Sequence, residues 1–136
     1  FNNDRGGLLA FLRHHLAGSA LRPGSTHQAI ARAGFRAIVT AWYDELLEQA
    51  LRDAGCRVTR VVRDRQQTDA SGEREVFVVK LYGCLSDDEA LILRPCAHKT
   101  RLLQLEDKLK LVTSFCQLRP PLFVGFDLSD ITPQML

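Results

Sequence analysis

The stretch "RAIVTAWYDELLEQALRDAGCRVTRVVR", residues 36–63, decides the fold. It opens with a short β-branched run at 36–41, bounded by a glycine turn, which is typical of a buried strand. Asp44 can then cap a helix at 44–54, whose apolar residues recur at helical spacing up to a terminal glycine. A second strand is expected at 57–63. Strand, helix and strand in this order predict an α/β domain with a mostly parallel sheet.

The rest of the chain supplies further helices and strands. A leucine stripe predicts a helix at 7–17, and Thr26 is expected to cap a short helix that closes at Gly34. The polar segment 66–75 is predicted to be a turn. The remaining expected elements are strands at 76–82, 90–94 and 121–125 and a long helix at 98–117.

Length and composition favour a single soluble domain. The chain has 136 residues, of which 46% are hydrophobic and 25% charged, and this suffices for one core. Its apolar runs fall short of the roughly 20 residues that a membrane helix needs. Because no signal peptide is visible, we expect a cytoplasmic protein without membrane contact. The first residue is Phe1 rather than Met, so residues 1–136 are expected to be a domain of a longer chain.

The charges do not favour nucleic acid. The net charge is +2, and basic and acidic residues are mixed along the chain rather than gathered in a patch. One arginine-rich run, "RVTRVVRDR", is best explained as the solvated edge of a strand and its loop. Its arginines are Arg57, Arg60, Arg63 and Arg65.

The cysteines and histidines do not predict a metal site. The two closest cysteines stand twelve residues apart, whereas zinc sites take ligands two to four residues apart. Reduced thiols are therefore expected. His14 and His15 are adjacent and would point about 100° apart on a helix, so they cannot chelate one ion as a pair. The four cysteines are Cys56, Cys84, Cys96 and Cys116.

A ligand crevice in a parallel sheet lies beyond the carboxyl ends of the strands. Three segments of this chain follow directly after predicted strands, namely 40–44, 82–85 and 125–130. These are the segments in which the sequence predicts functional residues.

The same three segments carry a family resemblance. "AIVTAWYDELLEQAL" (37–51), "VFVVKLYGCL" (76–85) and "PLFVGFDLSD" (121–130) resemble, in order and spacing, three motifs of sirtuin-like domains: "IVTTNYDxLLE", "VxKLHGxL" and "LLFVGxSLxD". The likeness covers about residues 27–131. It implies a Rossmann-like, mostly parallel sheet with helices on both faces. It also implies NAD as the cofactor, whose bond between nicotinamide and ribose is broken.

Three functional positions of the family have changed. The family's asparagine beside the nicotinamide ribose is Trp42, its histidine base is Tyr82, and its serine near the phosphates or adenosine ribose is Asp127. An indole removes the amide and fills space, so we expect Trp42 to be buried as a plug in the crevice. A phenol holds its proton at neutral pH and is a poor general base. A carboxylate would repel a pyrophosphate.

Other parts of the family's cofactor site are absent or reduced. The glycine-rich "GAGxS" turn that would hold the pyrophosphate does not occur in the sequence. The resemblance marks five residues as a vestigial cofactor site. All of them except Asp127 also have structural explanations as caps, turns or close-packed positions. They are Thr40, Asp44, Gly83, Gly125 and Asp127.

The sequence therefore predicts a catalytically degenerate sirtuin-like domain with no cofactor. It would serve as an interaction or regulatory module, and the family context suggests a bacterial defence or signalling protein. Its partner would be another domain of a longer chain or a separate protein, and self-association is left open. Two alternatives remain: an NAD-cleaving enzyme with rearranged groups, in which His98 or Asp87 replaces the base, and a domain that senses NAD or ADP-ribose without turnover.

Overall fold

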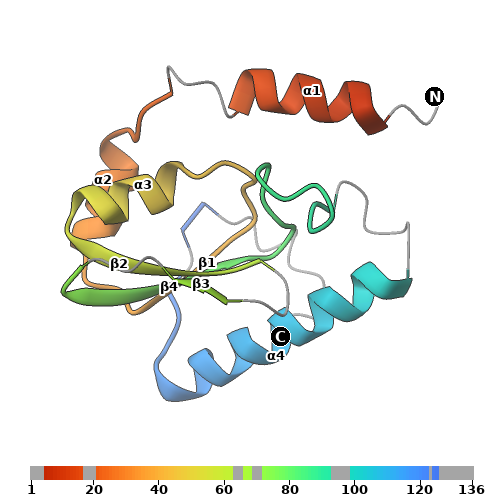
Figure 1. The fold of residues 1–136 in the computed structure, drawn as a ribbon. Helices are drawn as coiled ribbons and strands as arrows, with labels where there is room; N and C mark the ends of the chain where they lie inside the picture. Colours follow the sequence, from red (N-terminus) through yellow and green to blue (C-terminus); the bar gives the residue numbers. More distant parts are fainter. Residues whose placement is uncertain are drawn as a thin grey trace.

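The computed structural model describes residues 5–16, 21–62, 66–68, 72–92, 99–122 and 124–125. Figure 1 shows how the helices and strands of these residues are arranged. In order, the elements are α1 (Arg5–Leu16), α2 (Ser25–Arg32), β1 (Ala37–Thr40), α3 (Leu46–Asp53), β2 (Cys56–Val61), β3 (Gln66–Thr68), β4 (Arg74–Lys80) and α4 (Lys99–Leu118).

The four strands form one mostly parallel sheet. Its strand order is β1-β4-β2-β3, so β4 lies between the two strands that flank α3. β4 runs parallel to both neighbours, and its Val79 pairs with Val39 on one side and with Val61 on the other. The short β3 is antiparallel to β2 at the edge. The predicted α/β class and parallel sheet are confirmed.

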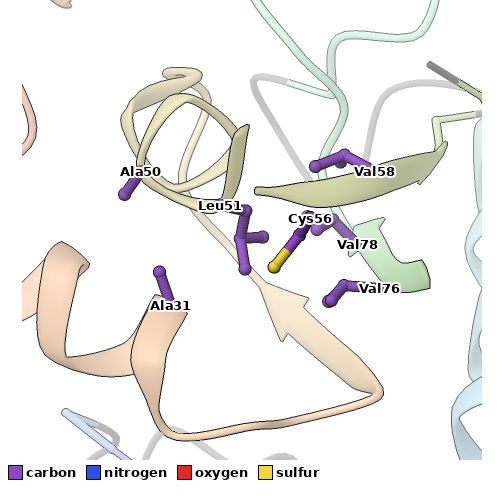
Figure 2. Packing of buried hydrophobic residues seen from close by; sticks show 7 residues of the cluster. All are labelled: Ala31, Ala50, Leu51, Cys56, Val58, Val76 and Val78. Atoms are coloured by element: carbon purple, nitrogen blue, oxygen red, sulfur yellow. The ribbon is translucent and has the colours of Figure 1, made fainter. Parts of the chain in front are cut away.

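Helices cover both faces of this sheet, as expected. α1, α2 and α3 lie on one side and α4 on the other (Figure 1). Alternate residues of β4 point to opposite faces: Val76 and Val78 join the core under α2 and α3, whereas the Phe77 ring lies 5.9 Å from that of Phe115 in α4. Figure 2 shows the α2–α3 core, which consists of Ala31, Ala50, Leu51, Cys56, Val58, Val76 and Val78.

Several predicted boundaries were wrong at polar segments. α2 begins at Ser25 with Gly24 as its N-cap, so Thr26 lies inside the helix and does not cap it. The segment 66–75 was predicted as a turn, yet it contains β3 and the start of β4. An edge strand needs no buried side-chain face, so β3 can pair with β2 despite its polar sequence.

Two predicted strands are not strands. Ala90 lies in a turn and residues 91–92 have no regular structure, while residues 93–94 lie outside the described residues. This apolar segment is instead buried as a loop folded against the end of β4, where the Ile92 amide donates to the Tyr82 carbonyl at 2.9 Å.

The second predicted strand that is absent is the segment 121–125. Its described residues are exposed and irregular, and Phe123 lies outside the described residues. Pro120 and Pro121 have no amide proton to donate to a neighbouring strand, which is consistent with the lack of pairing there.

Among the described helices, none combines the length and the apolar character that crossing a bilayer demands.

Candidate functional site

Two of the three predicted segments meet at the carboxyl ends of the parallel strands. The Leu81 amide donates to the Thr40 carbonyl at 3.0 Å, and the Leu85 amide donates to the Tyr43 carbonyl at 3.0 Å. The segment after β1 therefore lies beside the segment after β4. Of the third segment, Gly125 is exposed with φ +69°, and Asp127 lies outside the described residues.

The prediction that Trp42 is a buried plug is wrong. Its side chain is 66% exposed, and its amide donates to Thr40 Oγ1 at 3.2 Å. The next residue, Tyr43, turns inward instead, packs beside Leu85 and Leu91, and donates its hydroxyl to the Ile92 carbonyl at 3.1 Å. Tyr43 can be partly buried because its hydroxyl finds a hydrogen-bond acceptor in the Ile92 carbonyl.

Tyr82 and Gly83 follow β4 directly. Tyr82 is half-buried and lies near Tyr43: burial, and then the charge of Tyr82, raise the pKa of Tyr43 above its ordinary value of 10.0. Gly83 has φ +89°, and a Cβ at this position would stand 2.2 Å from the Ala90 carbonyl oxygen. Gly83 is therefore needed for the close approach of the 90–92 loop.

Asp44 stands at the entry to α3, where the sequence predicts a capping residue. Its Oδ1 accepts a hydrogen bond from the Leu46 amide at 3.0 Å, one residue ahead of the N-cap Glu45. The Asp44 carbonyl also accepts a hydrogen bond from Lys80 Nζ. Asp44 thus joins the end of β1, the start of α3 and the end of β4.

A buried ion pair lies directly behind this junction. Lys80 Nζ is 3.1 Å from Glu48 Oε1, and the side chains are 1% and 0% exposed. Neither Glu48 oxygen has a well-aligned hydrogen-bond donor within the described chain, so the attraction of opposite charges is what offsets the loss of solvation. Sequence reasoning missed this pair, because charged residues on a helix and at a strand end ordinarily face water.

A second polar network, also missed, links the ends of β2 and β4. Glu45 Oε1 lies 2.8 Å from Arg60 Nη1 and accepts hydrogen bonds from Ser86 Oγ at 2.7 Å and Cys84 Sγ at 3.2 Å. Burial works to raise the Glu45 pKa, but these hydrogen bonds and the Arg60 charge outweigh it and lower the pKa. Burial raises the pKa of the Cys84 thiol, so it stays protonated and is a poor nucleophile.

α4 reaches the same strand end from the opposite face of the sheet. Lys108 is 3% exposed, and its Nζ donates to the carbonyls of Lys80 at 2.8 Å and Leu81 at 3.2 Å. Cations from α4 and from β4 are thus both buried at the end of one strand.

Of the two replacement bases considered from the sequence, Asp87 lies within the described residues. Asp87 Oδ1 accepts from the amides of Glu89 and Ala90, both at 3.2 Å, and so stabilises its own turn. His98 lies outside the described residues. No trio of His, Cys, Asp and Glu side chains within the described ranges is grouped closely enough to hold a metal ion.

A mostly parallel sheet between two helical layers, with polar groups gathered at the strand carboxyl ends, defines an α/β domain of Rossmann-like architecture. The family model of the SIR2-like domain matches residues 36–135, and the chain belongs to this family. The resemblance seen in the three motifs is thereby confirmed. Comparison with curated proteins gave no match.

Proposed function

We propose that this chain is a catalytically degenerate SIR2-like domain that acts as a protein-interaction or regulatory module. The supporting observation is that the strand-end acids within the described chain already have other partners. Asp44 and Asp87 accept hydrogen bonds from backbone amides. Glu45 forms an ion pair with Arg60, and Glu48 forms one with Lys80. The family's base position is held by Tyr82, and a phenol is a poorer general base than the imidazole that it replaces.

The exposure of Trp42 supports the interaction role. An indole that is 66% exposed beside the strand ends presents a large apolar surface to solvent. Tryptophan is enriched among the residues that dominate binding energy at protein interfaces. Trp42 is therefore a better candidate for contacting a partner than for filling the crevice.

We also propose that this module lies in the cytoplasm. The three described cysteines, Cys56, Cys84 and Cys116, are free thiols, which is usual in the cytoplasm. The family resemblance suggests a larger bacterial protein concerned with defence or signalling, in which the partner is another domain or a separate protein.

A second candidate function is the sensing of NAD or ADP-ribose without turnover. The outward position of Trp42 favours it, because the side chain that was expected to block the cofactor does not occupy the crevice. An exposed indole can also stack on the flat ring of a nucleotide base. The charge at Asp127 and the missing glycine-rich turn both weigh against tight binding of a pyrophosphate.

Calorimetric titration separates the two candidates. NAD and, separately, ADP-ribose are titrated into the wild type and into Trp42→Ala. The interaction module predicts only heats of dilution for both proteins. Saturable binding at micromolar affinity that weakens in Trp42→Ala would support the sensor instead, and nicotinamide release during the titration would revive the enzyme alternative.

A further inference from the structure

α1 precedes the family match, which begins at residue 36, yet it is docked on the strand-end site. Leu9 is buried, and Leu12 and Leu16 are partly buried, at the i, i+3 and i+7 positions of one helix face. Leu9 forms a buried cluster with Leu85 and Leu91, and Leu12, Leu16 and Tyr43 pack against this cluster. Tyr43 follows β1, Leu85 follows β4, and Leu91 belongs to the 90–92 loop. α1 therefore covers an apolar surface formed by the two site segments and the 90–92 loop.

Arg13 adds polar contacts between α1 and this surface. Arg13 Nε and Nη2 both lie 3.3 Å from the Leu85 carbonyl oxygen, and Nη2 also donates to Asp88 Oδ1. The Arg13 and Asp88 side chains are 44% and 50% exposed. Water can therefore compete for this ion pair, and its contribution is readily reversed.

The docked helix also has apolar side chains directed away from the domain. Leu8 is 46% exposed and Phe11 is 60% exposed. In Figure 1, α1 lies at the periphery, beside the loop that follows β4. The face of α1 that carries the three leucines and Arg13 is the one that contacts the domain.

We propose that the surface formed by Tyr43, Leu85 and Leu91, with the Leu85 carbonyl and Asp88 at its rim, is a helix-docking site. α1 is its intramolecular occupant, and an amphipathic helix of a partner protein displaces it. This names the partner class for the proposed interaction role and rests on that role.

The seated α1 defines the chemistry of that partner helix. The apolar surface takes leucine side chains at i, i+3 and i+7, as Leu9, Leu12 and Leu16 show. The two rim groups that contact Arg13 are acceptors, a carbonyl and a carboxylate, and a guanidinium fits both at once. A partner helix therefore carries an arginine next to its second leucine, which is the helix-in-groove mode of recognition.

The test uses the full chain with Arg13→Glu, which places a carboxylate opposite Asp88. Hydrogen exchange reports the release of α1, because a free helix of this length is marginal in water and its amides exchange faster. The probe is a labelled, capped peptide with the sequence of residues 5–16, followed by fluorescence anisotropy. A peptide with Leu9→Asp and Leu12→Asp is the control, and Asp88→Ala in the chain gives a milder release.

We expect faster exchange of the α1 amides in Arg13→Glu and peptide binding about tenfold tighter than to the wild type, whose own α1 occupies the site. Arg13→Glu with Asp88→Arg should restore part of the protection. Unchanged exchange in both Arg13→Glu and Asp88→Ala would overturn the proposal. So would equal binding of the peptide and its aspartate control. Neither readout depends on NAD, so failure here is distinct from failure of the proposed loss of catalysis.

Discussion

The pair formed by Lys80 and Glu48 is the most sensitive point of the strand-end site. Lys80→Met keeps the length of the side chain but leaves the Glu48 carboxylate, which is 0% exposed, without its counter-charge. Breaking a buried pair in this way costs about 3–5 kcal/mol, a large part of the roughly 5–15 kcal/mol that stabilises a domain. With a urea m-value of about 2 kcal/mol/M, the unfolding midpoint should fall by about 2 M in a melt followed by circular dichroism.

An exposed pair of the same length provides the matched control. Lys110 Nζ also lies 3.1 Å from a carboxylate, that of Asp107, but the two side chains are 76% and 62% exposed. Lys110→Met should cost less than about 1 kcal/mol. Lys80→Met combined with Glu48→Leu should be more stable than either single variant, since no unpaired charge remains. If Lys80→Met costs no more than Lys110→Met, the buried pair does not stabilise the strand end as inferred.

Three further substitutions test the strand ends. Trp42→Ala should change the free energy of unfolding by less than about 1 kcal/mol, because the ring is exposed. Acrylamide should readily quench the fluorescence of this single tryptophan. A loss of several kcal/mol would mean that Trp42 is buried in the crevice after all. Gly83→Ala should cost roughly 3 kcal/mol in the same urea melts, through backbone strain and overpacking. Gly55→Ala should show the strain alone, because Gly55 has φ +76° and nothing lies within 4 Å of the added Cβ. Glu45→Gln should be less stable than the wild type at neutral pH. Folding lowers the Glu45 pKa below its ordinary value of 4.5, so the wild type's advantage is fully present above this pH and is lost as the pH falls through the lowered pKa. In urea melts from pH 7 to pH 3, the stabilities of the wild type and Glu45→Gln should therefore converge.

The regular parts of the fold were accessible from the sequence because their periodicity is strong. The β-branched runs gave β1 and β4, and the leucine spacing gave α1 and α3 to within a few residues. Parallel strands end at the same edge of a sheet, so the meeting of the segments after β1 and β4 could also be predicted.

The irregular parts were not accessible. Whether Trp42 or Tyr43 turns inward depends on the path of a turn that has no periodicity, and on the position of the Ile92 carbonyl, which is distant in sequence. The apolar loop at 90–92 has the composition of a strand and is buried like one, but it has no neighbouring strand to pair with among the described residues. The burial of Glu48 and Lys80 follows only from their meeting across two elements.

Nicotinamide release measures directly whether the domain has lost NAD cleavage. Purified wild-type chain is incubated with NAD at high protein concentration, and nicotinamide is separated by chromatography and compared with a protein-free blank. Tyr82→His restores the family's base, and Tyr82→Phe is its matched control. We expect release at the level of the blank for the wild type and Tyr82→Phe. We expect no recovery in Tyr82→His, because Trp42 still replaces the amide that the family sets beside the ribose. Release by the wild type well above the blank would contradict the loss of NAD cleavage.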